Sequence, residues 1–561
     1  MERLSRREIL RLAAVLGVSP MVLGLAGCDE AGEADAPETD AGGGGEGGGG
    51  EGGEPDAGPV DDGLPRYAYD GEPGPDDLFQ HGVASGDPLT DAIILWTRVT
   101  GVDAATDVFW EIAATADFAE RANVGTFTTD GDRDFTVKVD ADGLTADTTW
   151  FYRFHALGRT SPVGRSRTAP SGAVDRLRLA VVSCSSYAHG WFHAYRELAT
   201  QPDLSAVVHL GDYIYEYANG KYGNVREYDP PHEIITLDDY RRRYRHYRLD
   251  PWLQAVHRQH PFICIWDDHE VANDSWRGGA ENHDEDTEGP WSERRAAAEK
   301  AYSEWIPIRE APDGRIFRTL RYGDLVDLIM LDSRLWGRDM QARGMAADPE
   351  RTLLGFDQEA WLDDQFRTST ARWRLLGQQV MMGQLLFRAA PTLPITSLNP
   401  DQWDGYEAAR GRLFGSVRDN GVGNLVVLTG DIHTSWAMEL TEDPNDADRY
   451  DPLTGEGALA VEFVGTSVTS PGLPAVQPAL LETILSVNPH IKFVNVQQRG
   501  WLQLDITPER VQGAWFLYER VDTDEPQTAQ IGAIYEVMDG VARLLAVDEV
   551  APPIPNAPPL A

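Results

Sequence analysis

Within residues 204–216, a short apolar run at residues 206–210 stops at a turn and is followed at once by Asp and Tyr side chains. A continuous apolar run of this length is typical of a strand buried on both faces, as in a parallel sheet. Gly211 breaks the run, and Asp212 and Tyr215 come directly after it. Because ligands of open α/β sheets bind beyond the carboxyl ends of the strands, we expect Asp212 and Tyr215 to lie at a functional edge.

The same arrangement recurs along the chain. Four further apolar runs each end in polar or reactive side chains. Residues 178–184 end in Cys184, and residues 261–270 end in Asp267, Asp268, His269 and Glu270. Residues 325–334 end in Asp332, Ser333 and Arg334, and residues 424–433 end in Asp431 and His433. A single Gly-Asp pair is ordinary turn chemistry. Several strands that bring Asp, His, Cys or Tyr to one edge of a sheet indicate a metal site instead.

The mixture of donor types predicts two metal ions of different character. Carboxylates suit Mg²⁺ or Ca²⁺, whereas imidazole and thiolate suit iron or zinc. Two metals about 3.5–4 Å apart are a known arrangement for phosphate ester hydrolysis, in which one metal lowers the pKa of a bound water. Asp212 is the candidate bridging ligand, and Cys184 and His433 are candidate ligands from their own strand ends.

The predicted catalytic residues are Asp212, His269 and Arg334. His269 is either a general acid or a residue that orients a metal ligand. Cys264 lies between Ile263 and Ile265, so we expect a buried core thiol there.

Composition excludes some functions. The chain has 561 residues and a formal net charge of −41, with 49 basic and 90 acidic residues. Nucleic-acid binding needs clustered Lys and Arg, so nucleic acid is not an expected partner. The charge also argues against electrostatic docking on an anionic membrane. Three cysteines imply no disulfide framework.

The N-terminal residues predict export and a lipid anchor. Residues 1–27 carry four Arg and then an apolar run, which is typical of a signal peptide. Residues 5–11 resemble a twin-arginine signal, and residues 25–28 resemble a lipobox in which Cys28 is lipidated. Residues 28–74 are a Gly- and Glu-rich stretch that cannot form a core, so we interpret it as a flexible tether.

The rest of the chain divides by pattern into two predicted domains. Short alternating strands indicate a β-sandwich domain over residues 75–170, and strand–helix alternation indicates an α/β catalytic domain over residues 175–561. We expect helical structure at residues 237–260 and 291–305 and a hairpin at residues 501–517. The first helical stretch carries Arg241, Arg242, Arg243, Arg245 and Arg248, most of them expected on a solvated face, with one able to hold a phosphate.

The motifs together resemble the PhoD-like alkaline phosphatase/phosphodiesterase family of the calcineurin-like metallophosphatases. The resemblance runs over residues 78–520, and its matching stretches are residues 82–88 (GVASGDP), 183–185 (SCS), 211–215 (GDYIY), 266–273 (WDDHEVAN), 377–380 (GQQV), 430–433 (GDIH) and 463–472 (FVGTSVTSPG).

This resemblance implies an α/β/β/α metallophosphatase sandwich preceded by a fibronectin-like β-sandwich. It implies Fe³⁺ with Ca²⁺, other divalent ions being alternatives. The implied iron ligands are Cys184, Asp212, Tyr215 and His433. The implied calcium ligands are Asp212, Asp431, and either Asp268 or Asn273.

We therefore expect a monomeric hydrolase of phosphate mono- and diesters, in which metal-activated water attacks phosphorus. The expected location is periplasmic or at the bacterial cell surface, with the membrane contacted through the lipid anchor only. Phospholipase D activity on glycerophospholipids is the alternative within enzymes. A lipid-anchored binding protein with a structural metal is the alternative from another class, although structural sites are closed by protein ligands and this edge is rich in unpaired donors.

The lipobox gives a first prediction. Cys28→Ser removes the acylated thiol, so the protein is expected to move from the membrane fraction to the soluble fraction and to carry no acyl chain by mass spectrometry. Cys264→Ser is the matched control, because it removes a thiol outside the lipobox. Wild-type protein that is already soluble and begins at another residue would contradict the assignment.

Overall fold

The computed structural model describes residues 62–388, 396–472 and 478–561. The predicted signal peptide, Cys28 and most of the predicted tether lie outside these described residues. Within the described ranges, helices are too short or too polar to cross a membrane.

The first sheet has ten strands and contains residues from both predicted domains. Its centre is parallel, because β10 pairs in parallel with β9 and β11, and β11 with β1. The predicted hairpin is present, with Ile506 opposite Val511. The strands in spatial order are β24 (Leu544–Ala546), β23 (Gln530–Met538), β22 (Arg510–Tyr518), β21 (Arg499–Ile506), β9 (Leu177–Val182), β10 (Ala206–His209), β11 (Pro261–Cys264), β1 (Val83–Gly86), β2 (Ile93–Arg98) and β5 (Thr136–Ala141).

The second sheet has seven strands, and its centre is also parallel. In spatial order they are β12 (Arg318–Tyr322), β13 (Val326–Met330), β14 (Trp373–Gly377), β17 (Leu425–Thr429), β19 (Ala460–Val464), β18 (Ser435–Leu440) and β20 (Ile491–Asn495). Side chains from both sheets, such as Val208 and Val426, belong to one buried hydrophobic cluster. The two sheets therefore pack face to face.

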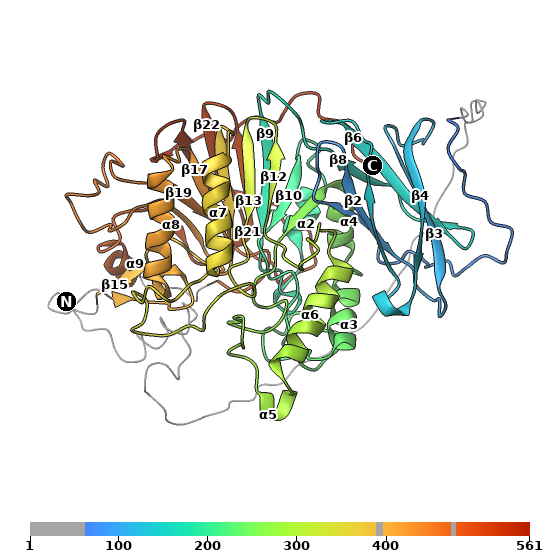
Figure 1. Ribbon diagram of the computed structural model, residues 1–561, viewed down its shortest axis with the longest axis horizontal. Helices are drawn as coiled ribbons and strands as arrows, with labels where there is room; N and C mark the ends of the chain where they lie inside the picture. The colour runs from blue at the N-terminus through green and yellow to red at the C-terminus, as the bar shows by residue number, and fades with distance from the viewer. Residues whose placement is uncertain (1–61, 389–395, 473–477) are drawn as a thin grey trace.

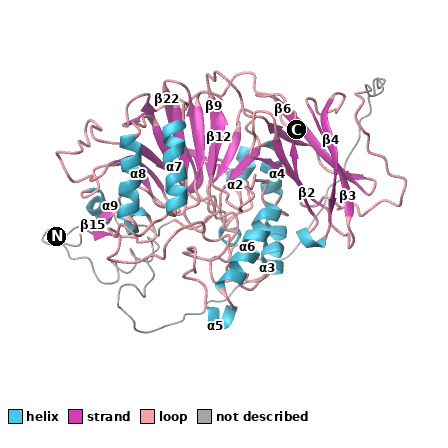
Figure 2. Cartoon of the chain, in the orientation of Figure 1, coloured by secondary structure: helices cyan, strands magenta, loops and turns pink. Residues whose placement is uncertain are grey.

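Helices cover the outer faces of the two sheets. Figure 1 shows α7 (Phe356–Thr368) and α8 (Glu407–Asp419) side by side over the second sheet. The helices α2 (His193–Leu198), α3 (Leu237–Tyr247), α4 (Pro251–Gln259) and α6 (Trp291–Trp305) group near the middle of the molecule. In Figure 2 the loops gather at one end of the strands, which is where the predicted site residues belong.

The N-terminal β-region is built on an extension of the first sheet. A five-stranded sheet of β4 (Arg121–Thr129), β3 (Thr106–Ala113), β6 (Thr149–Ala156), β7 (Arg159–Thr160) and β8 (Gly164–Arg167) packs against β1, β2 and β5 over a core of its own. Because Ser85 of β1 pairs with Pro261 of β11, one sheet runs through both predicted domains. The sequence pattern did not predict this pairing.

The helical prediction for residues 237–260 was wrong in one respect, because the segment forms two helices. Helix α3 ends at Tyr247 and α4 begins at Pro251. Proline lacks the N–H that a continuous helix needs, and it suits the first helical position. The side chain of Asp250 caps α4 by accepting hydrogen bonds from the backbone N–H groups of Trp252 and Leu253.

Candidate metal centre

The predicted ligands come from the carboxyl ends of parallel strands in both sheets. Cys184 follows β9, Asp212 follows β10, and Asp268 follows β11. From the second sheet, Asp431 and His433 follow β17. The site therefore lies at the sheet edge that open α/β folds use for ligands.

The four predicted iron ligands lie together. One sulfur, carboxylate or ring-nitrogen donor from each of Cys184, Asp212 and His433 lies within 4.8 Å of the other two. The hydroxyl of Tyr215 donates a hydrogen bond of 2.9 Å to Asp212 Oδ2 and lies 3.2 Å from His433 Nε2. Ser470 Oγ donates to the same hydroxyl at 2.6 Å, so Tyr215 is held in this position from a second direction.

The predicted calcium side is a group of carboxylates next to these residues. Donor atoms of Asp267, Asp268 and Asp431 lie within 4.8 Å of one another. Asp212, Asp268 and His269 form an overlapping group at the same spacing. Asp212 therefore belongs to both sides, as a bridging ligand must.

The choice between Asp268 and Asn273 favours Asp268. Asp268 is buried inside the carboxylate group. The side-chain amide of Asn273 instead donates to Glu281 Oε2 at 2.7 Å, and its backbone N–H donates to Glu216. We keep Asp268 as the predicted ligand and interpret Asn273 as a residue that shapes the loop.

The structure does not support direct substrate contact by Arg334. Its side chain has no exposed surface. Its Nε donates to Asp267, and one terminal nitrogen donates to Asp431 Oδ1 at 2.7 Å. The other donates to both carboxylate oxygens of Asp401 at 2.9 Å. We interpret Arg334 as a residue that positions and neutralises carboxylates.

The site still holds more buried negative charge than its arginines neutralise. Burial raises the pKa of Asp431 to about 7, a shift that Arg334 opposes and that Asp401 and other nearby carboxylates increase. Burial and the nearby carboxylate of Asp212 raise the pKa of Glu270 to about 8, against hydrogen bonds from the backbone.

The second oxygen of Asp267 is buried without a hydrogen-bond partner in the described residues. Buried charges need pairing or a metal, so this excess and this free oxygen fit bound cations.

His269 is oriented by a carboxylate that sequence reasoning did not single out. Its Nδ1 lies 2.7 Å from Glu216 Oε2, and both residues are buried. Burial lowers the pKa of His269, but Glu216, Asp268 and Asp212 outweigh burial and raise the pKa well above 6.5. These carboxylates favour the charged imidazolium, which is the form that can donate a proton. Glu216 directly follows Tyr215, and that position next to a predicted ligand is the only signal for it in the sequence.

Glu270 and Gln402 have supporting roles that the sequence pattern did not predict. The carboxylate of Glu270 accepts hydrogen bonds from the backbone N–H groups of Asp212, Tyr213 and Asp267, so it links the turns after β10 and β11. Gln402 donates to Asp431 Oδ2. These contacts join residues far apart in sequence, which local patterns cannot reveal.

Four of the predicted ligands have left-handed backbone conformations. The φ angles are 60° at Cys184, 57° at Asp212, 59° at Asp431 and 58° at His433. A non-glycine residue in this region costs roughly 1–2 kcal/mol. Such strain clusters at functional sites, where the surrounding structure maintains it.

The arginines of the helical stretch are engaged elsewhere. Arg241 pairs with Glu304, Arg242 with Asp229 and Arg245 with Asp134. Arg243 donates to backbone carbonyls, and the guanidinium of Arg248, directly after α3, lies 4.4 Å from the ring centroid of Trp96. The expectation that one of these arginines holds a phosphate was wrong, because each has its own partners within the fold.

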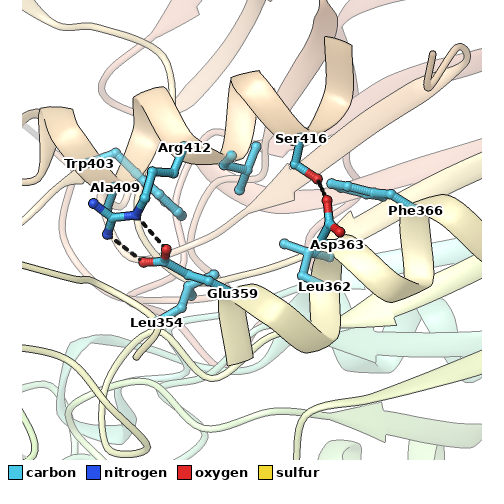
Figure 3. A pocket seen from close by; sticks show the side chains of 10 residues that line it. Leu354, Glu359, Leu362, Asp363, Phe366, Trp403, Ala409, Arg412 and Ser416 are labelled. Atoms are coloured by element: carbon cyan, nitrogen blue, oxygen red, sulfur yellow. Dashed lines mark hydrogen bonds and ion pairs between the residues drawn. The ribbon is translucent and has the colours of Figure 1, made fainter. Parts of the chain in front are cut away.

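A separate cavity of about 170 Å³ lies between α7 and α8. Figure 3 shows its rim, where Glu359 pairs with Arg412 and Ser416 donates to Asp363. Its lining contains none of the predicted site residues. The metal centre thus remains the candidate functional site.

Comparisons with known proteins agree with this geometry. The family model described as PhoD-like phosphatase matches residues 179–515, and the model of its N-terminal domain matches residues 67–170. Alkaline phosphatase D of Bacillus subtilis (strain 168) is 39% identical over 459 residues, which is 77% of this chain and 76% of that protein.

Two solved structures are similar in fold. A structure of PhoD matches with a TM-score of 0.78 and 35% identity, covering 87% of this chain and 94% of that chain. A purple acid phosphatase from yellow lupin (Lupinus luteus) seeds matches with a TM-score of 0.54 and 13% identity, covering 81% and 74% of the two chains. These matches confirm the predicted α/β metallophosphatase-like fold.

The shared position of Asp212 gives a prediction about metal content. Asp212→Asn keeps the shape of the side chain but removes the negative charge that the predicted iron and calcium ligand groups share. At least one metal ion should therefore be lost, as measured by elemental analysis. We expect activity to fall by at least roughly 100-fold, because even residues that only support metal ligands contribute 10–100-fold. Asp419→Asn, at a carboxylate with 79% of its side chain exposed, is the control with the same charge change. Near-normal turnover with full metal content in Asp212→Asn would refute the bridging role.

Proposed function

This chain belongs to the PhoD-like phosphatase family and is a phosphatase, and from that premise we propose that it hydrolyses phosphate mono- and diesters outside the cytoplasm, using Fe³⁺ and Ca²⁺. The binding-protein alternative is set aside because the family consists of enzymes. The observation that carries the proposal is the division of the site into two donor groups that share Asp212.

The donor types support the proposed metals. Thiolate, phenolate and imidazole from Cys184, Tyr215 and His433 suit iron, whereas the carboxylates of Asp268 and Asp431 suit calcium. When bound, two such metals lower the pKa of a water and polarise the phosphoryl oxygens.

The residues of the chain supply orientation and proton transfer. Glu216 holds the imidazole of His269 through Nδ1, which leaves the other ring nitrogen to donate a proton to the departing alcohol. Arg334 fixes the carboxylates of Asp267 and Asp431 relative to each other across the two sheets. Pre-set groups of this kind need no rearrangement as charge develops in the transition state.

The proposed location rests on the sequence pattern of residues 1–28. We propose that the protein is an exported lipoprotein whose catalytic body acts as a monomer at the end of a Gly- and Glu-rich tether. About 45 flexible residues would give a root-mean-square reach of roughly 35–40 Å. That reach would let the site meet soluble esters away from the membrane surface.

Turnover of p-nitrophenyl phosphate is the direct test of the function. We expect release of p-nitrophenol that a chelator abolishes and that added Ca²⁺ restores. Glycerophospholipid vesicles assayed in parallel separate the phosphatase from a phospholipase D. A faster reaction on the vesicles would replace the proposed substrate class, and full activity in the presence of chelator would refute the metal requirement.

Iron bound to Tyr215 gives a spectroscopic prediction. A phenolate bound to ferric iron absorbs visible light, so the purified protein should be coloured, and Tyr215→Phe should bleach the band while the fold persists. Tyr215 is fully buried, so Phe keeps nearly all of its packing. Tyr195→Phe, at another fully buried tyrosine, is the control and should keep the colour. Colourless wild-type protein with stoichiometric iron, or a band that survives in Tyr215→Phe, would show that Tyr215 only packs.

A further inference from the structure

An arginine outside the predicted set lies at the same sheet edge as the metal centre. β21 runs antiparallel to β9, with Leu502 opposite Val181. Counting three residues back from Leu502 and three forward from Val181 brings Arg499 and Cys184 to the same end of the two strands. Arg499 is the first residue of β21, so it begins where β9 delivers a predicted iron ligand.

The backbone beside Arg499 is joined to the loop that holds Tyr215. The N–H of Gly500 donates to the carbonyl of Ser467 at 2.9 Å, and Ser467 Oγ donates to the carbonyl of Ser470. Ser470 in turn donates to the Tyr215 hydroxyl. Arg499 is thus fixed relative to Tyr215 through three consecutive hydrogen bonds.

The guanidinium of Arg499 has an unused edge. One terminal nitrogen donates to the carbonyl of Gln497 at 2.8 Å. Its Nε is buried and has no hydrogen-bond partner among the described residues. Across those residues, Arg499 also forms no ion pair with a carboxylate, in contrast to Arg334 with its four carboxylate partners. Because Nε is buried, the second terminal nitrogen is the part of the guanidinium left to donate a charge-assisted hydrogen bond to an oxyanion.

Two aromatic side chains, His189 and Tyr222, lie near enough to interact electrostatically with Arg499, and they lead to Tyr215 of the metal centre. The ring of His189 packs edge-on against Tyr222 with centroids 4.3 Å apart, and Tyr222 stacks on Tyr215 at 5.4 Å. Burial, with smaller contributions from the charges of His433 and Arg499, lowers the pKa of His189 to about 4. His189 is therefore neutral at physiological pH, and Arg499 is the permanent cation of this side of the site.

We propose that Arg499 is a substrate-binding residue whose free terminal nitrogen contacts a phosphate oxygen and favours dianionic monoesters over monoanionic diesters. The proposal rests on the function proposed above and adds a substrate preference to it. A fixed cation attracts two negative charges more strongly than one. The helix arginines and Arg334 cannot take this role, because each is already engaged with partners of the fold.

The test compares Arg499→Ala, Arg499→Gln and Arg499→Lys with wild-type protein loaded with its metals. The substrates are p-nitrophenyl phosphate and bis(p-nitrophenyl) phosphate, and inorganic phosphate serves as inhibitor. We expect kcat/KM for the monoester to fall roughly 10- to 100-fold in the Ala and Gln variants, the range for a lost charge-assisted hydrogen bond. The diester should lose clearly less, and the inhibition constant of phosphate should rise with the monoester effect.

Arg499→Lys should recover part of the monoester activity, because it restores the charge without the guanidinium geometry. Arg321→Ala is the matched control, since its side chain is 68% exposed and lies on edge strand β12. It should leave both substrates and phosphate inhibition unchanged. Metal content measured on every variant separates substrate binding from an indirect loss of metal.

Equal losses on both esters, or an unchanged inhibition constant of phosphate, would overturn the proposal. If the Ala variant does not fold, the Gln and Lys variants carry the same comparison. Protection by inorganic phosphate against thermal unfolding tests Arg499 without any turnover. Wild-type protein that hydrolyses neither ester, yet gains stability from phosphate only when Arg499 is present, would refute the proposed function and keep the binding role.

Discussion

The ion pairs of Arg334 hold together the two sheet edges that make the site. Arg334 follows β13 of the second sheet, yet its Nε bonds to Asp267, which follows β11 of the first. Its remaining nitrogens bond to Asp401 and Asp431. A buried charge that loses its partner costs about 3–5 kcal/mol. The relative position of the two sheets and the spacing of the carboxylates therefore depend on the same guanidinium.

Local pattern was enough to predict the strand ends but not the contacts made beyond them. The run before Asp212 is apolar and buried, and Gly211 and Asp212 then interrupt it, so both the strand and the turn are visible in the sequence. Glu216, Asp401 and Gln402 carry no comparable signal, because their partners are brought to them only by folding. The burial of Arg334 was missed for the same reason, since an arginine after a strand looks like a residue available to substrate.

The missed pairing of β1 with β11 has a similar origin. Ser85 and Pro261 are far apart along the chain, and either strand can be recognised alone. The change in composition near residue 170 suggests a domain boundary. Backbone hydrogen bonds between strands do not depend on composition, so a sheet can continue across that boundary. The break at Pro251 was more accessible, because proline after Asp is a local signal for a helix start.

The left-handed conformations of the ligand residues oppose stability to function at individual residue positions. Glycine would adopt φ near 60° without strain at Cys184, Asp212, Asp431 or His433, so mutations that relax the empty fold also delete a donor. A selection for thermal stability alone would favour such substitutions and remove ligands from the metal centre. Variants of these positions that are more stable without metal are therefore the ones that bind metal less well. A screen for stability that omits the metals selects against the metal ligands.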